Sequence, residues 1–160
     1  MKLKIYVGIY LASLVVANLL VAKLGPWFSP INSFVLIGLD LSLRDKLHDA
    51  WQGKNLTIKI GCLIVAAGLI SYLLNPAAGT IALASVVAFC AAMAADSIVY
   101  QLLRRQGWMT RANGSNMAGA IVDSLIFPTI AFGSFVPQRV AQQFVAKVFG
   151  GAVWSFILRK

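Results

Sequence analysis

Charged residues are scarce in this chain of 160 residues, and acidic ones are the scarcest. Only 12% of the residues are charged, half the share of about 25% that is usual in soluble domains. Glutamate is absent, and the five acidic residues are all aspartates: Asp40, Asp45, Asp49, Asp96 and Asp123. With 59% hydrophobic residues, the composition excludes an ordinary water-soluble globule and a disordered chain. A nucleic-acid-binding module is also excluded, despite the net charge of +9, because no basic residues interleave with aromatics on a soluble face.

Uncharged runs of membrane-spanning length fill most of the sequence. Ile5–Ala22 and Ile60–Ala95 carry no charge, and Ala112–Gln138 and Val140–Leu158 carry a single charge each. A helix needs about 20 mostly apolar residues to cross a bilayer, and lipid does not tolerate open sheet edges. The sequence therefore predicts an all-α polytopic membrane protein with a single domain over residues 1–160. Its six transmembrane helices, bundled together, are expected at residues 5–23, 31–46, 57–74, 78–104, 114–135 and 139–158. Asn113-Gly114-Ser115 is expected to form a turn that leads into the fifth helix, with an N-cap at Ser115.

The positive charges gather on one side of this predicted bundle. If six helices alternate in direction, eleven Lys and Arg residues lie on the side of the two termini, and only Lys23 and Arg139 lie on the other. The positive-inside rule places the crowded side in the cytoplasm. We therefore expect a multi-pass protein of the cytoplasmic (inner) membrane with both termini cytoplasmic and a first helix that is retained.

Three of the aspartates lie inside predicted membrane helices at similar depths. Asp96 and Asp123 each begin the pattern Asp-Ser-aliphatic-aliphatic-aromatic, which ends at Tyr100 and Phe127. Both are about 12 Å from the predicted cytoplasmic surface by helical rise, and Asp40 is about one turn shallower. A carboxylate there costs about 2.5–3.5 kcal/mol, so a set of three needs a cause. Polar contacts between helices are the simpler explanation. A substrate pathway is the one that we favour.

Small residues precede two of these aspartates on the same helix face. They are Ala84, Ala88 and Ala92 before Asp96, and Gly119 and Ala120 before Asp123. Such residues allow either close helix packing or a cavity for a flat ligand, and the sequence leaves both open. Lys147, on the last helix, either neutralises an aspartate inside the bundle or faces a wet outer vestibule, and we favour the inner partner.

Motifs for nucleotide hydrolysis and for catalysis are missing. The sequence has no phosphate-binding loop, so the chain has no ATPase of its own, and it lacks the H-E-x-x-H and G-x-S-x-G patterns. We expect no enzyme activity, no cofactor and no metal site. Asp45, His48 and Asp49 are more typical of a solvated helix end than of a metal cluster. An intramembrane two-aspartate protease stays open, because Asp96 and Asp123 lie on successive helices.

Taken together, these residues resemble the queuosine precursor transporter family, also called the VUT family. The resemblance covers nearly the whole chain and is strongest over residues 95–133. It rests on Asn18 and Asp40, on Ala95-Asp96-Ser97 with Tyr100, and on Arg111, Ser115-Asn116, Asp123-Ser124-x-x-Phe127 and Ala131-Phe132. Larger members follow the second-helix Asp with an acidic residue and an aromatic-Gly pair. This chain has Arg44–His48 there, so it resembles a compact member.

The resemblance implies uptake of the 7-deazaguanine precursors preQ0 or preQ1, driven by a gradient or by trapping inside the cell. The implied substrate-binding residues are Asp40, Asp96, Ser97, Tyr100, Asn116, Asp123, Ser124 and Phe127. A guanine-like edge offers two parallel N–H donors, which a carboxylate such as Asp96 or Asp123 can accept together, while Asn116 binds the carbonyl. Tyr100, Phe127 or Phe132 is expected to stack on the ring.

The main alternative is the substrate-binding subunit of a multi-component vitamin importer, which is also six-helical and has no ATPase. Such subunits dock through small residues four apart on the first helix, whereas Ala12, Ala17 and Ala22 are five apart here. A purine-like small molecule and the lipid bilayer are the expected partners. The identity of the deazapurine, proton coupling and homo-oligomer formation are left open by the sequence.

Overall fold

Every regular element in the described part of the chain is helical, which confirms the predicted all-helical class. The computed structural model describes residues 2–51 and 55–158, without the side chains of residues 2, 45, 48, 49, 108, 109 and 111–113. The longer helices are α1 (Lys2–Leu24), α3 (Gly38–Trp51), α4 (Leu56–Leu74), α5 (Gly79–Leu102), α6 (Trp108–Phe132) and α7 (Pro137–Ile157). Short 3-10 turns, η1 (Pro26–Phe28) and η3 (Pro76–Ala78), end two of the connections.

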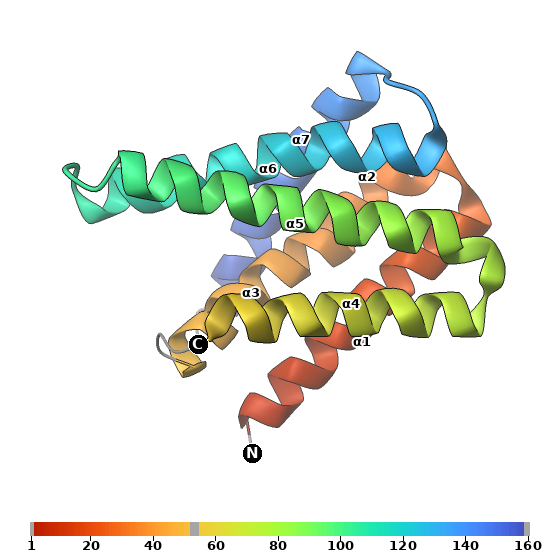
Figure 1. Cartoon of the computed structure of the whole chain (residues 1–160), viewed down its shortest axis with the longest axis horizontal. Helices are drawn as coiled ribbons and strands as arrows, with labels where there is room; N and C mark the ends of the chain where they lie inside the picture. The colour runs from red at the N-terminus through yellow and green to blue at the C-terminus, as the bar shows by residue number, and fades with distance from the viewer. Residues whose placement is uncertain (1, 52–54, 159–160) are drawn as a thin grey trace.

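The second helical segment is one rod of mixed geometry. The short α2 (Ser29–Asn32) continues into the π-helical η2 (Ser33–Ile37) and then into α3 without a break. Residues 29–51 together are long enough, at about 1.5 Å per residue, to cross a bilayer. Counting this rod as one unit, successive helices alternate in direction, and both described ends of the chain lie at the same end of the bundle (Figure 1).

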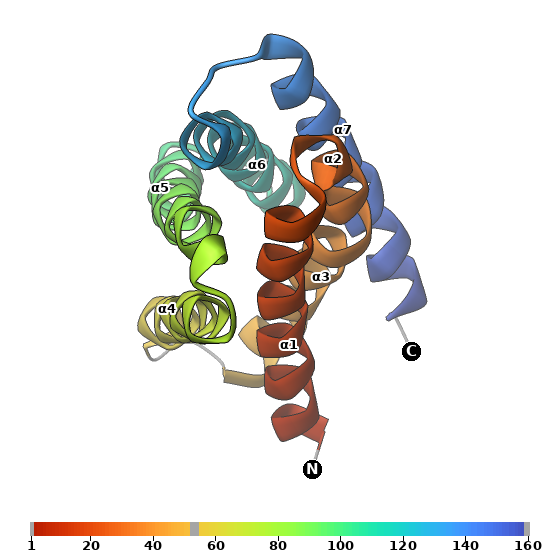
Figure 2. The ribbon, with the colours of Figure 1, turned by 90° about the vertical axis from the view of Figure 1, so that its right-hand side faces the viewer.

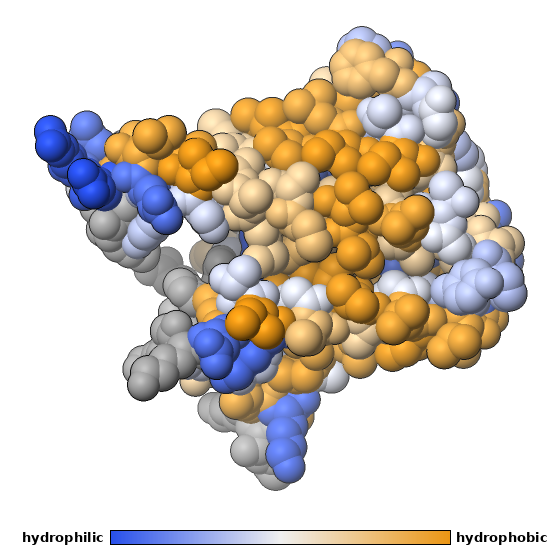
Figure 3. Space-filling view, viewed as in Figure 1, coloured by the Kyte–Doolittle hydropathy of each residue, from blue (hydrophilic) through white to orange (hydrophobic). Residues whose placement is uncertain are grey.

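The exterior of the bundle is apolar. Five helices, α1, α4, α5, α6 and α7, are long and apolar enough to span a membrane, whereas the rod over residues 29–51 carries charges from Asp40 onward. Large side chains that a soluble protein would bury face outward, such as Leu73 and Leu102, which are 78% and 76% exposed. Apolar residues cover the middle of the face in Figure 3, and hydrophilic residues gather at its left end. The chain is a polytopic membrane protein.

Seen end-on, α4, α5 and α6 form one side of the bundle, and α1, α3 and α7 form the other (Figure 2). Tyr10, Leu14, Leu43 and Ile64 belong to the buried apolar cluster that joins α1, α3 and α4. Asn18 is the polar residue that the sequence places inside the first helix, and it is tied into the neighbouring helix. Its amide donates to the Ser71 hydroxyl at 3.2 Å, which links α1 to α4 and satisfies a polar group that lipid could not.

The rod and α7 cross with their backbones in contact. A Cβ atom added at Gly38 would lie 2.6 Å from the carbonyl carbon of Gly150, and one added at Gly150 would overlap the carbonyl of Phe34. Only glycine fits at such a crossing. The Trp154 indole donates to the Val35 carbonyl at 2.8 Å, so α7 also supplies a hydrogen bond to the π-helical segment.

The predicted start of the fifth helix is wrong. The sequence predicted a turn at residues 113–114 and an N-cap at Ser115, but α6 begins at Trp108 and runs through these residues. The reason lies in the hairpin with α5. A Cβ atom at Gly114 would lie 2.7 Å from Leu103 Cδ1, so a glycine inside this helix permits close packing that outweighs its poor helix propensity.

Candidate functional site

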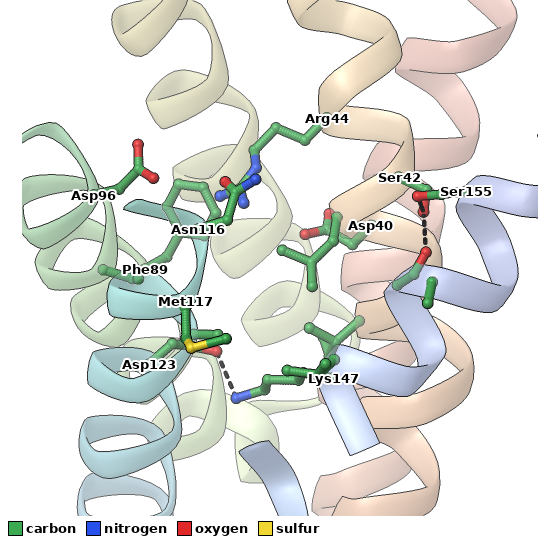
Figure 4. Close-up of a pocket in the computed structure, with 18 residues that line it drawn as sticks. Asp40, Ser42, Arg44, Phe89, Asp96, Asn116, Met117, Asp123, Lys147 and Ser155 are labelled. Carbon is green, nitrogen blue, oxygen red and sulfur yellow. Dashed lines mark hydrogen bonds and ion pairs between the residues drawn. The ribbon is translucent and has the colours of Figure 1, made fainter. Parts of the chain in front are cut away.

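A cavity of about 480 Å³ lies between α3, α5, α6 and α7. Its volume is within the range of about 300–1,000 Å³ that is usual for small-molecule sites. Figure 4 shows the side chains that surround it. Its polar and aromatic lining consists of Asp40, Ser42 and Arg44 from α3, Phe89 and Asp96 from α5, Asn116 and Asp123 from α6, and Lys147 and Ser155 from α7.

Small side chains leave the space that the cavity occupies. Ala92, Gly119 and Ala120 line it, whereas Ala84 and Ala88 are fully buried away from it. A Cβ atom at Gly119 would lie 3.3 Å from the Ala92 carbonyl oxygen, so α5 and α6 also approach closely here. The small residues nearest the aspartates therefore serve both the packing and the cavity, and Ala84 and Ala88, nearer the start of α5, serve the packing.

One wall of the cavity holds a buried ion pair. The Lys147 ammonium lies 2.6 Å from Asp123 Oδ2, and the Lys147 side chain is only 4% exposed. The same ammonium donates to the Ser124 hydroxyl at 3.3 Å and to Gln143 Oε1 at 3.5 Å. Gln143 in turn donates to the Ser29 hydroxyl at 2.7 Å, so this series of polar contacts extends from Asp123 to the start of the rod. The prediction that Lys147 neutralises an aspartate inside the bundle is confirmed.

The other two aspartates of the cavity have an unused acceptor each. Asp40 Oδ1 and Asp96 Oδ1 are buried and have no hydrogen-bond partner. Asp40 is 2% exposed and follows the π-helical segment closely. Such π-helical insertions change the rotation of the residues that follow them and are frequent at functional sites. Unsatisfied buried carboxylate oxygens are costly, and in a cavity they are free to bind donors from a ligand.

Arg44 is the second cation of the cavity. It lies one helical turn after Asp40, yet the structure records no ion pair within 4 Å between these two described side chains. Its guanidinium group instead lies over the Phe89 ring, 5.4 Å from the centroid. This cation–π contact joins α3 to α5 across the cavity.

The structure brings together half of the residues expected to bind substrate. Asp40, Asp96, Asn116 and Asp123 line the cavity. Ser97 and Tyr100 are exposed and are not among the described lining residues, Ser124 is fully buried beneath Lys147, and Phe127 packs edge-on against Phe132. Whether any of the eight binds substrate stays a prediction.

Two lining residues, Arg44 and Phe89, were not proposed from the sequence. Arg44 is four residues after Asp40, and Phe89 is seven residues before Asp96, so each shares a helix face with its aspartate. That spacing is the signal that could have identified them. Among the described residues, no cluster of potential metal ligands is found. The side chains of Asp45, His48 and Asp49 lie outside the described part.

Comparison with known proteins identifies the family. The profile of the family described as "Putative vitamin uptake transporter" matches residues 2–159, nearly the whole chain, and the chain belongs to this family. Searches of curated proteins and of solved structures each returned no match. The resemblance drawn from the sequence is thereby confirmed at the level of the family.

Proposed function

We propose that this member of the vitamin uptake transporter family is a carrier that takes up 7-deazaguanine queuosine precursors, preQ0 or preQ1, through the cavity between α3, α5, α6 and α7. The observation that carries the proposal is the buried, unpartnered Asp96 Oδ1 in a cavity that Asn116 also lines. A guanine-like edge presents two parallel N–H donors next to a carbonyl oxygen. A carboxylate and an amide on neighbouring walls are the complement of that pattern.

Asp96 is better suited than Asp123 to accept the guanine edge. Asp123 Oδ2 is already held by Lys147 at 2.6 Å, so binding a ligand there would disrupt a buried ion pair. Asp96 has no ion pair among the described residues and lies on α5, next to α6, which carries Asn116. In this arrangement the substrate carbonyl accepts from the Asn116 amide, and the Phe89 ring is the lining aromatic that can stack on the heterocycle.

The proposal includes a topology. Together with the five apolar helices, the rod over residues 29–51 would make six membrane crossings. The chain would lie in the cytoplasmic (inner) membrane, with both termini in the cytoplasm. Lys4, Lys59, Arg104 and Arg105 lie at the ends of helices on the side of the termini, which supports this orientation under the positive-inside rule. The whole chain would act as a single domain. Because it has no phosphate-binding loop, uptake would draw on a gradient or on trapping inside the cell.

Uptake of labelled preQ0 and preQ1 by cells that depend on this protein tests the proposal. Asp96→Asn replaces a charge-assisted, bidentate acceptor with a neutral group, so we expect uptake to fall about tenfold or more. Ser97→Ala, at the neighbouring exposed position, is the matched control and should transport normally. Full uptake by Asp96→Asn at equal membrane expression would refute the site, and absence of uptake by the wild type would refute the function.

The structure bears on the two alternatives differently. A two-aspartate protease needs a pair of carboxylates that share a proton, and Asp123 is instead paired with Lys147. A substrate-binding subunit of a multi-component importer would have the same cavity. Co-purification of an ATPase with the tagged protein would favour that subunit over an independent carrier.

A further inference from the structure

The charges around the cavity do not balance. Its described lining contains three carboxylates, Asp40, Asp96 and Asp123, and two cations, Arg44 and Lys147. Asp123 and Lys147 neutralise each other in an ion pair of 2.6 Å. One negative charge is therefore left over in a compartment that lies within a membrane bundle, where an uncompensated charge is expensive.

Of the two lining carboxylates without an ion pair, Asp40 is the more deeply buried. This residue is 2% exposed, its Oδ1 has no hydrogen-bond partner, and no described cation lies within 4 Å of it. Arg44, one turn away, acts on Asp40 electrostatically but forms no ion pair with it within 4 Å, and its guanidinium lies over Phe89. The buried Tyr10 hydroxyl lies close enough to interact with the Asp40 carboxylate, and it has no other hydrogen-bond partner among the described residues. Figure 4 shows the Asp40 carboxylate turned from α3 toward the space between the helices.

We propose that Asp40 binds a protonated amine on the substrate, so that the cavity selects flat heterocycles that carry a cationic group. This inference rests on the proposed function and deepens it, because it distinguishes between the two precursors. The 7-aminomethyl group of preQ1 is protonated at neutral pH, whereas the 7-cyano group of preQ0 is uncharged. The carrier should therefore prefer preQ1.

The positions of the acids fit such a ligand. Asp96 and Asn116 lie on α5 and α6, and Asp40 lies across the cavity on α3. In preQ1 the aminomethyl group is on the five-membered ring, away from the edge that carries the two parallel N–H donors. A ring bound by that edge to Asp96 presents its amine toward the opposite wall. An ammonium has three donors, enough for Asp40 Oδ1 and a neighbouring acceptor.

Equilibrium binding of preQ1 and preQ0 to the detergent-purified protein tests the inference. The wild type is expected to bind preQ1 more tightly, and Asp40→Asn should weaken preQ1 binding about tenfold to a hundredfold, the range for hydrogen bonds to a charged group. The same variant should bind preQ0 within about threefold of the wild type, which also shows that it is folded. Arg44→Gln should instead increase the preference for preQ1 over preQ0, because removal of a cation leaves the cavity more negative.

The outcomes separate this inference from the proposed function. If the wild type binds preQ0 as tightly as preQ1, or if Asp40→Asn weakens both equally, cation selection is refuted while deazaguanine uptake stands. If neither precursor binds, the proposed function fails. The panel therefore includes thiamine, a permanently cationic flat heterocycle, and uncharged riboflavin. If the wild type binds thiamine and Asp40→Asn abolishes that binding, cation selection is supported independently of the precursors. If neither precursor nor thiamine binds, cation selection is refuted as well.

Discussion

Replacement of Lys147 by methionine tests the electrostatics of the cavity most directly. The Lys147 side chain is 4% exposed and that of Asp123 is 23% exposed, with 2.6 Å between Nζ and Oδ2. Methionine fills most of the same volume without a charge. Lys147→Met therefore leaves Asp123 as an uncompensated carboxylate while it disturbs the packing of α7 little.

The expected cost follows from how buried each partner is. Loss of one member of a buried ion pair costs about 3–5 kcal/mol. Asp123 lines the cavity and keeps some access to water, so we expect the low end, about 3 kcal/mol, for Lys147→Met. Asp123→Asn leaves a much more deeply buried ammonium, so we expect the high end, about 5 kcal/mol. The double variant leaves neither charge unpaired, so it should be less destabilised than either single variant.

The measurement is reversible unfolding in mixed detergent micelles of the wild type, both single variants and the double variant. Lys23→Met is the matched control, because Lys23 is exposed at the end of α1, and its effect should stay within about 0.5 kcal/mol. Two results would refute the reasoning. One is a single variant no less stable than the control, and the other is a double variant whose loss equals the sum of the two single losses.

Two further substitutions test the crossing of the rod with α7 by the same unfolding assay. Gly150→Ala should lose about 1–3 kcal/mol, because the new methyl group would overlap the Phe34 carbonyl and push the helices apart. Gly61→Ala, where nothing lies within 4 Å, should instead gain up to about 1 kcal/mol from helix propensity, and equal effects at the two positions would contradict the crossing. Trp154→Phe removes the indole donor, which the Val35 carbonyl accepts in addition to the Gly38 amide, and should lose up to about 1 kcal/mol; an unchanged stability would contradict a contribution of this hydrogen bond to the crossing.

The helices were predictable where the signal is contiguous in sequence. Ile60–Ala95 carries no charge, so Asn75-Pro76 and Gly79 are what divides it, and the structure places the connection there with Asn75 accepting from the Ala77 amide. The start of α6 was not predictable in this way. Gly114 is typical of a turn when the sequence is read along the chain, but its lack of a side chain leaves room for Leu103, the residue that follows α5.

The level of the three aspartates was predictable, but how far the cavity extends along each helix was not. Counting residues from the charged helix ends placed Asp40, Asp96 and Asp123 at similar levels, and all three line one cavity. The same count could not show that Tyr100, four residues beyond Asp96, lies past the cavity, or that Phe89, seven residues before it, lines the cavity. The ion pairs were not predictable either, because three aspartates and two cations can pair in several ways that the sequence does not distinguish.

The absence of glutamate acquires a physical meaning at this cavity. A carboxylate that must wait for a ligand should be held still, because every rotatable bond that binding freezes reduces the affinity. Aspartate has one fewer such bond than glutamate, so its carboxylate stays close to the backbone of its helix. At Asp40 and Asp96 that keeps an acceptor at the wall and leaves the volume of about 480 Å³ for a ligand. A glutamate would fill part of that volume itself. Its longer side chain could also form an ion pair with Arg44 or Lys147 and so neutralise the negative charge that is unpaired in the present arrangement.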